Sequence, residues 1–320
     1  MEAAIPIPEL ESKIKAFQAS IGHVIKGKPE VVELVSVALL AQGHLLIEDV
    51  PGVGKTTLAH ALARSFDCTF QRIQFTSDLL PSDLIGASIY NQLEHQFEFR
   101  KGPLFANVVL ADEINRTTPK TQSALLEAMS EGKVTTDNKT YDLPNPFVVI
   151  ATQNPIEHHG TYPLPESQLD RFLMRIEMGY PSYGVEKEIL RSNISYETAD
   201  DLAPVMSAGE LLEAQKLVEK VEMDDILLEY LMALVGATRR SEYLTLGVSP
   251  RGAMSLYRAA QARAFAQGRH YCIPDDVKQL ASPVFSHRVM VSTKHSSPLQ
   301  KTEESRAIIQ ELIDEVEVPL

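Results

Sequence analysis

The sequence contains no tryptophan and only two cysteines among its 320 residues. Cys68 and Cys272 are too far apart to form a Cys-x-x-Cys pair or a zinc-binding pattern, so we expect buried thiols in a reducing cytoplasm. Positive charge is also scarce, because 30 Lys and Arg residues oppose 43 Asp and Glu residues and give a formal net charge of −13. This balance disfavours chain-wide electrostatic binding to nucleic acid or to an anionic membrane.

Long apolar segments are missing as well. No run approaches the roughly 18 residues that a membrane-spanning helix needs, and residues 1–10 lack the apolar centre of a targeting sequence. We therefore expect a cytoplasmic globular protein without a membrane anchor. The length favours two domains, and the strand-like patterns stop near Pro181, which places the domains at residues 1–181 and 182–320.

A glycine-rich loop between an apolar run and a helix-like segment is the most informative feature that is present. Residues 48–57 read Glu-Asp-Val-Pro-Gly-Val-Gly-Lys-Thr-Thr. In such a loop, glycines let backbone N–H groups point toward phosphates, the lysine reaches the β and γ phosphates, and the next hydroxyl binds Mg²⁺. The general pattern has Gly where this chain has Asp49, and we expect Asp49 to tolerate left-handed backbone there. The alternative is a glycine-rich turn with a solvated lysine.

We predict that the phosphates of a nucleotide, which the family resemblance described below implies to be ATP, are bound by consecutive residues of this loop, namely Pro51, Gly52, Val53, Gly54, Lys55, Thr56 and Thr57. An apolar turn with glycines precedes the helix that begins near Pro29, and a turn in that place can pack on the base of a nucleotide. We therefore place Val24, Ile25 and Gly27 against adenine, with ordinary helix packing as the alternative.

Two further apolar runs end in polar side chains. One leads into Asp112 and Glu113, and the other leads into Asn154. Continuous apolar runs are typical of strands buried in a parallel sheet, whose carboxyl ends meet at one edge. We predict that Asp112 binds Mg²⁺ together with Thr56, and that Glu113 is the general base that activates water. Asn154 would contact the γ-phosphate or that water; an Asn before a proline turn is the alternative.

Several arginines could complete the site. Arg171 or Arg175 would lie at the edge of the sheet, where it could stabilise the transferring phosphoryl group of a neighbouring subunit. A surface salt bridge is the alternative for Arg171. A capped helix start projects Arg251 toward the sheet, where it could close on the γ-phosphate. Arg116 would face either a neighbouring subunit or solvent.

Two hairpins interrupt the alternation of strands and helices. Residues 87–100 and 134–143 each contain two strand-like runs about a polar turn. The first would interrupt a helix, so we expect it to protrude and to contact a client or partner. Beyond Pro181 only helical patterns follow, which predicts a separate helical domain. His158 and His159 lack a third ligand at metal-binding spacing, and we expect them in an exposed loop.

In this order, the motifs resemble those of an AAA+ ATPase and, more narrowly, of the MoxR family of chaperone-like AAA+ ATPases. The resemblance runs from about Ile7 to the C-terminus and rests on residues 48–56, 111–116, 119–129, 151–155, 160–166 and 249–251. It implies Walker A at Lys55 and Thr56, Walker B at Asp112 and Glu113, sensor 1 at Asn154, an arginine finger near Arg171 and sensor 2 at Arg251. It also implies the clade with hairpins inserted in helix 2 and before sensor 1.

The expected fold is α/β: a parallel AAA+ P-loop sheet flanked by helices, with two hairpin inserts, followed by a smaller all-helical lid domain. The resemblance also implies a homo-oligomeric ring, usually a hexamer, that acts with a von Willebrand factor A-domain protein to mature clients or insert cofactors or metals. We therefore predict an Mg²⁺-dependent ATPase that remodels a protein client. One alternative is a nucleic-acid motor, which the mixed charge of both hairpins disfavours. The other is a nucleotide-gated scaffold without hydrolysis, which would not need Glu113.

Overall fold

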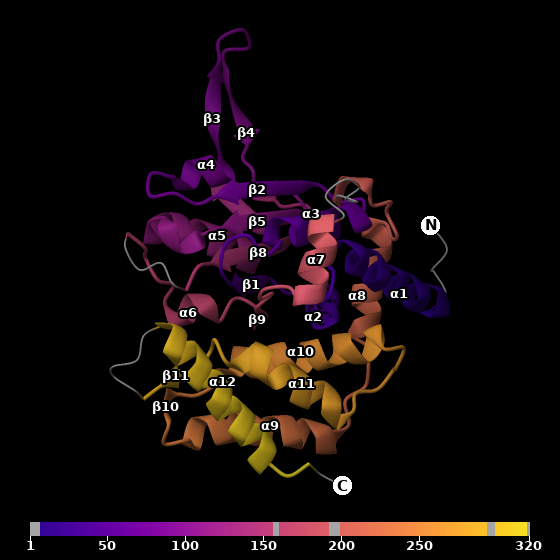
Figure 1. The fold of residues 1–320 in the computed structure, drawn as a ribbon. Coiled ribbons are helices and arrows are strands. Elements are labelled where there is room, and N and C mark those ends of the chain that lie inside the picture. Colours follow the sequence, from indigo (N-terminus) through magenta and orange to yellow (C-terminus); the bar gives the residue numbers. More distant parts are fainter. Residues whose placement is uncertain (1–6, 156–159, 192–198, 293–297, 319–320) are drawn as a thin grey trace.

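The computed structural model, shown in Figure 1, describes residues 7–155, 160–191, 199–292 and 298–318. Its centre is a five-stranded sheet in the order β2-β5-β8-β1-β9, and every neighbouring pair is parallel. The inner strands are buried along almost their whole length, as continuous apolar runs predict. The strands are β1 Leu45–Glu48, β2 Phe70–Gln74, β5 Val108–Asp112, β8 Val148–Gln153 and β9 Met174–Ile176.

Helices cover the sheet, and the chemical motifs meet at one of its edges. The helices of this part are α1 Ile7–Val24, α2 Pro29–Leu40, α3 Lys55–Ser65, α4 Pro81–Ile85, α5 Pro119–Glu131 and α6 Glu166–Leu169, with a 3₁₀ turn at Ile114–Arg116. The carboxyl ends of parallel strands lie on the same side. The glycine-rich loop, the Asp112–Glu113 pair and Asn154 follow three adjacent strands, so the fold brings them together as predicted.

Both predicted hairpins are present. The first, β3 Gly86–Asn91 and β4 Gln96–Lys101, follows α4 directly and projects from the body of the molecule (Figure 1). The second pairs β6 Lys133–Thr136 with β7 Lys139–Asp142. The Phe99 ring stacks on the Tyr141 ring with centroids 4.2 Å apart, which joins the base of the first hairpin to the second.

The C-terminal part is helical, as predicted, but it also contains a small ribbon. Its helices are α7 Tyr183–Arg191, α8 Ala208–Val218, α9 Asp225–Arg240, α10 Pro250–Ala266, α11 Pro274–Phe285 and α12 Pro298–Glu315, with a 3₁₀ turn at Ala199–Asp201. Strands β10 Leu244–Leu246 and β11 Met290–Val291 pair antiparallel across this lid. Runs of two or three residues are too short to show the alternation of a strand, so these two strands were not predicted.

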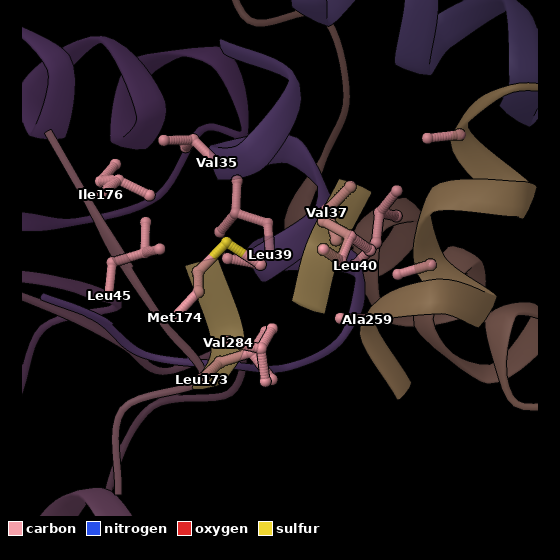
Figure 2. Close-up of a cluster of buried hydrophobic side chains, with 14 of the residues drawn as sticks. Val35, Val37, Leu39, Leu40, Leu45, Leu173, Met174, Ile176, Ala259 and Val284 are labelled. Atoms are coloured by element: carbon pink, nitrogen blue, oxygen red, sulfur yellow. The ribbon is translucent and has the colours of Figure 1, made fainter. Parts of the chain in front are cut away.

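One hydrophobic core connects the lid to the sheet. Helix α2 packs against β9 and α10, α11 packs directly against β9, and buried side chains of all four elements belong to one cluster. Figure 2 shows part of this cluster, with Val35, Val37, Leu39, Leu40, Leu45, Leu173, Met174, Ile176, Ala259 and Val284 labelled. Because the core includes residues from both sides of Pro181, the division into two domains at that residue stays a prediction.

Two expectations from composition can be compared with the structure. Cys68 and Cys272 are both unpaired, as expected, although Cys68 is only partly buried. Burial raises the pKa of the two thiols to about 11 and about 12, respectively. Within the described residues, no helix combines the length and the apolarity needed to cross a membrane.

Candidate nucleotide-binding site

The loop between β1 and α3 has the backbone of a phosphate-binding loop. Gly52 and Gly54 have φ angles of +86° and +97°, and a Cβ added at Gly52 would meet nothing within 4 Å. Residues with a side chain rarely adopt such positive φ angles. Glycine is therefore needed at these two positions for the backbone conformation, and not because space is short. Gly54 also caps α3, and the free N–H groups of a helix's first turn attract anions.

Lys55, the first residue of α3, turns its side chain back along the loop. Its Nζ donates hydrogen bonds to the backbone oxygens of Asp49 at 2.9 Å and Val50 at 3.2 Å. Burial lowers the pKa of the Lys55 ammonium, and the charges of Asp49, Asp112 and Glu113 act in the opposite direction. The ammonium therefore depends on nearby negative groups to offset its burial, and a polyphosphate would meet that requirement.

A cavity of about 480 Å³ opens between this loop and the strand ends. Cavities of this size are common for small-molecule ligands. Of the predicted site residues, it brings together Pro51, Gly52, Gly54, Lys55, Thr56 and Thr57 of the loop with Asp112, Glu113 and Asn154 of the strand ends. Val53 does not line the cavity and packs against the hydrophobic core instead.

Both carboxylates of the Asp112–Glu113 pair are held by hydrogen bonds. The Thr152 hydroxyl donates to Asp112 Oδ1 at 2.6 Å and accepts from the Glu113 backbone N–H at 2.9 Å. Arg72 Nη2 donates to Asp112 Oδ2 at 2.6 Å, and Gln74 Nε2 donates to Glu113 Oε2 at 2.7 Å. Glu113 itself has left-handed backbone, with φ 58° and ψ 49°, a conformation that non-glycine residues adopt mainly under constraint.

Arg72, Gln74 and Thr152 line the cavity, yet the sequence reasoning did not identify them. A signal was available for the first two residues. Arg72 and Gln74 alternate on β2, and the register places Gln74 opposite Asp112. Side chains two residues apart on a strand share a face, so polar residues at the end of this strand point toward the same edge as the carboxylates.

These residues fit a nucleotide with Mg²⁺. Thr56 is exposed and lines the cavity together with Asp112. Each carboxylate oxygen has two acceptor directions, so Asp112 keeps capacity beyond its contacts with Thr152 and Arg72. Within the described part of the chain, no group of three or more His, Cys, Asp or Glu side chains could hold a metal by itself. A hydroxyl and a carboxylate suit Mg²⁺, which would take its other ligands from phosphate oxygens and water.

The predicted adenine contacts do not line this cavity. Helix α1 continues through Gly22 to Val24, so the apolar turn is shorter than expected. Val24 and Ile25 are buried in the core, and a Cβ at Gly27 would lie 2.8 Å from Cγ2 of Val185 in α7. Their contact with adenine stays a prediction. His158 and His159 lie outside the described residues.

The reason given for Asp49 was wrong. Asp49 does not have a positive φ, so its backbone does not need the freedom of glycine. Instead its side chain is buried, at 8% exposure, and Oδ2 accepts hydrogen bonds from the backbone N–H groups of Met178 at 2.7 Å and Gly179 at 2.6 Å. Oδ1 accepts from the backbone N–H of Val50 at 2.8 Å.

Arg171 and Arg251 lie near each other, but away from the phosphate loop. They line a second cavity, of about 550 Å³, together with Arg258, Gly43 and Ser130. Gly43 precedes β1 and Ser130 is near the end of α5, so this cavity is at the amino-terminal edge of the sheet. A four-residue strand spans about 13 Å, and the phosphate loop lies beyond its other end. The two cavities share no lining residue.

Two other arginines have partners within the chain. Arg175 is 6% exposed, and its Nη1 pairs with Glu48 Oε2 at 3.2 Å. It therefore lacks the exposure that contact with a neighbouring subunit requires. Arg116, which we expected to face a neighbour or solvent, pairs with Glu113 Oε2 at 3.1 Å.

Comparison with known proteins identifies the family. The family described as ATPase family associated with various cellular activities (AAA) matches residues 44–174, and the AAA lid domain family matches residues 236–312. The chain is 49% identical over 300 residues to the protein YeaC of Bacillus subtilis, which covers 94% of this chain and 93% of that protein. It is also 43% identical over 282 residues to Chaperone MoxR1 of Mycobacterium tuberculosis, and this match covers 85% of this chain and 74% of that protein.

The chain belongs to the MoxR family of AAA+ ATPases. A crystal structure of a protein from Cytophaga hutchinsonii has a TM-score of 0.88 to this MoxR-family chain at 39% identity, and covers 98% of this chain and 97% of that one. The resemblance drawn from the motifs is therefore confirmed, as are the P-loop sheet and the helical lid. Membership of this family makes the protein an ATPase.

Proposed function

We propose that this MoxR-family ATPase works in the cytoplasm as a ring of identical subunits, a hexamer, and that Mg²⁺-dependent ATP hydrolysis remodels a protein client. A von Willebrand factor A-domain protein would deliver or select the client, in a maturation step such as cofactor or metal insertion. The observation that carries the proposal is the separation of the two cavities. One contains the phosphate loop and the Asp112–Glu113 pair, and the other contains Arg171 and Arg251.

The arginine cavity has positive charge without a matching carboxylate. Arg171 Nη1 donates to the backbone oxygen of Leu126 at 2.7 Å and to the Ser130 hydroxyl. Asp170 lines the same cavity, but it pairs with Arg288 at 2.8 Å. Among the described residues, neither Arg171 nor Arg251 has an acidic partner. In a chain with a net charge of −13, this favours an anionic ligand from outside, and the phosphates of a neighbour's nucleotide would meet that need.

In the proposed reaction, Lys55 holds the β and γ phosphates, and Asn154 positions the attacking water. The water oxygen bonds to the γ-phosphorus as the bond to the β–γ bridging oxygen breaks, and Glu113 accepts the water's proton. Mg²⁺, bound through Thr56 and Asp112, would neutralise phosphate charge. Arg171 of the adjacent subunit stabilises charge on the transferring group, and Arg251 assists from the same cavity. The products are ADP and phosphate.

Complementation tests the shared site. Arg171→Ala and Glu113→Gln should each hydrolyse ATP at least about 100-fold more slowly than wild type. A mixture of the two variants should recover part of the activity, because an Arg171→Ala subunit keeps Glu113 and can receive Arg171 from a Glu113→Gln neighbour. Wild-type specific activity should also rise with protein concentration as subunits assemble. A mixture no more active than its components, with wild-type activity independent of dilution, would refute the in-trans arginine.

The β3–β4 hairpin supports a protein client. Its outer part exposes large apolar side chains, with Leu93 at 93% and Phe97 at 72% exposure. Exposed apolar side chains of this size suit contact with apolar polypeptide rather than with a phosphate backbone.

Stimulation assays test the client. ATP hydrolysis should rise when reduced, carboxymethylated lactalbumin is added as an unfolded probe, and Leu93→Ser with Phe97→Ser should remove that stimulation without changing the basal rate. Stimulation by DNA in place of protein would favour the nucleic-acid motor instead. Hydrolysis measured with a purified A-domain protein from the same organism tests the partner.

A further inference from the structure

Asp49 connects the phosphate loop to two other segments of the chain. Its backbone N–H donates to Gln153 O at 3.1 Å, at the end of the strand that leads to Asn154. Its backbone oxygen accepts from Lys55 Nζ at 2.9 Å. Its carboxylate accepts three backbone N–H groups, one from the loop and two from residues 178 and 179.

Residues 177–182 form the linker between β9 and α7. The linker is held on a second side by Lys28, whose Nζ donates to the Tyr180 backbone oxygen at 2.8 Å. Lys28 directly follows Gly27, in the turn that we predict to lie against adenine. The linker therefore runs between the phosphate loop and the predicted base contacts, with Asp49 fixing one side and Lys28 the other.

A carboxylate is the side chain that this position requires. Met178 is buried, at 3% exposure, so its N–H has little access to water if Asp49 is removed. Glycine, the residue of the general pattern, would leave the N–H groups of Met178 and Gly179 without these acceptors. Asparagine would place an NH₂ donor against either Val50 N–H or the pair of linker N–H groups, because both carboxylate oxygens of Asp49 already accept.

We propose that Asp49 is a positioning residue that fixes the linker between β9 and α7 to the phosphate loop, and so sets where the base of ATP lies relative to its phosphates. This inference rests on the proposed nucleotide site. It goes beyond that site because it makes one carboxylate responsible for the distance between the residues that contact the base and those that contact the phosphates.

The test compares Asp49→Asn with wild type. Mass-spectrometric hydrogen exchange of a peptide covering residues 177–182 should be at least about 10-fold faster in Asp49→Asn, with and without saturating ADP. In calorimetric titrations, ADP should bind at least about 10-fold more weakly, whereas tripolyphosphate should lose less than about 3-fold. For hydrolysis, KM for ATP should rise more than kcat falls. A variant that is only less stable would instead show a lower kcat, because a smaller fraction of the enzyme would be active.

Three further variants make the result interpretable. Lys55→Ala should weaken ADP and tripolyphosphate alike, because it acts on the phosphates themselves. Lys28→Met should release the linker from its other side and reproduce the loss of ADP affinity, and it serves if Asp49→Asn does not fold. Asp137→Asn, the same change at an exposed turn of the second hairpin, should alter nothing.

Two outcomes would overturn the inference while leaving the ATPase intact. One is linker exchange in Asp49→Asn equal to that of wild type. The other is an equal loss of ADP and tripolyphosphate affinity, which would place the effect in the phosphate loop alone. Failure of wild type to bind ADP would instead contradict the proposed nucleotide site, so the two failures can be told apart.

Discussion

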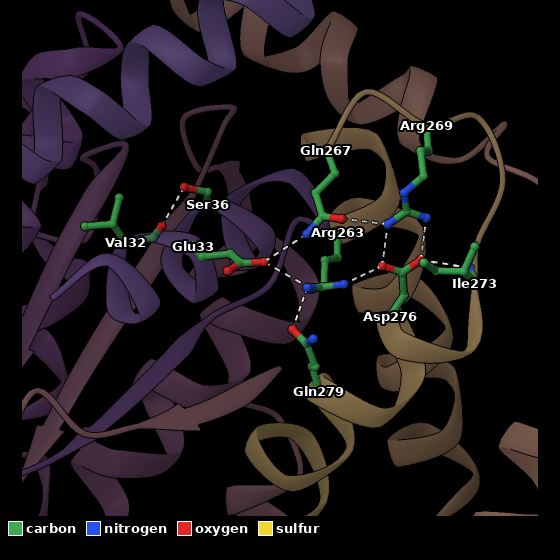
Figure 3. A network of polar contacts seen from close by, with 9 residues as sticks. All are labelled: Val32, Glu33, Ser36, Arg263, Gln267, Arg269, Ile273, Asp276 and Gln279. Carbon is green, nitrogen blue, oxygen red and sulfur yellow. Dashed lines mark hydrogen bonds and ion pairs between the residues drawn. The ribbon is translucent and has the colours of Figure 1, made fainter. Parts of the chain in front are cut away.

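A buried charge network joins the lid to the sheet and allows a matched stability test. Asp276 of α11 is fully buried, and its carboxylate contacts Arg263 Nη1 and both terminal nitrogens of Arg269, each at 2.7 Å (Figure 3). It also accepts the backbone N–H of Ile273 at 2.9 Å. On the other side of Arg263, Glu33 of α2 accepts from Nε at 3.0 Å. One arginine thus contacts a buried carboxylate and a partly exposed one.

We expect the same chemical change at the two carboxylates to have very different costs. Asp276→Asn leaves Arg263 and Arg269, with side chains 8% and 18% exposed, without their buried counter-ion. Removing one partner of a buried pair typically costs about 3–5 kcal/mol of folding free energy. Glu33 is 38% exposed, so water can solvate what Glu33→Gln leaves behind, and the expected cost is about 0–1 kcal/mol.

Urea denaturation followed by far-UV circular dichroism measures both costs. Asp276→Asn should lower the midpoint strongly with little change in the slope, and Glu33→Gln should leave the curve near that of wild type. The double variant should cost about as much as Asp276→Asn alone. If the two single substitutions cost the same within about 1 kcal/mol, burial does not determine the value of these ion pairs and the reasoning is wrong.

Two further outcomes follow from the geometry. Burial lowers the pKa of His44 to about 4, although the hydrogen bond between Nε2 and the Met129 backbone oxygen acts in the opposite direction. Its folded pKa is below the ordinary 6.5, so this contribution to stability is complete above pH 6.5 and is lost as the pH falls toward 4. Wild type should lose about 2 kcal/mol more than His44→Gln between pH 7 and pH 5 in urea titrations, and equal losses would contradict the shift. Gln74→Ala removes the hydrogen bond to Glu113, and steady-state assays should show kcat reduced about 10-fold with KM for ATP within about twofold. A change in KM alone would assign Gln74 to binding.

How much could be predicted from the sequence depended on whether a feature was local. Some features could be interpreted from a few neighbouring residues, because backbone freedom and strand burial are properties of short segments. They are the loop glycines, Lys55 and the apolar run before Asp112 and Glu113. The parallel P-loop sheet and the helical lid then followed from the family resemblance. The structure places these segments where they were predicted, and the roles of their side chains stay predictions.

Contacts between distant segments were not predictable in the same way. Asp49 was interpreted through its own backbone, whereas its carboxylate binds N–H groups about 130 residues later in the chain. Arg251 was expected to point toward the sheet, and it does lie against it, but at the edge away from the phosphate loop. Packing determines at which end of a strand a distant helix lies. A helix cap such as Ser249 determines only where the helix begins.

The junction between sheet and lid bears on how nucleotide state could be transmitted. A lid that swings freely would need a small, polar interface, as is common between mobile domains. Here α2 packs against β9 and α10, and α11 packs against β9, in one apolar core. The Glu33–Arg263 contact crosses the same junction, and Asp276 holds Arg263 from within the lid. Such a junction favours movement of the lid together with the amino-terminal edge of the sheet. Arg171 and Arg251 come from the two parts but share one cavity, so they would approach a neighbour's nucleotide as a single unit. Asp276→Asn loosens α10, which carries both Arg251 and Arg263. In the proposed ring it should therefore reduce hydrolysis more than it reduces ADP binding by each subunit, because there hydrolysis would need Arg171 and Arg251 in register.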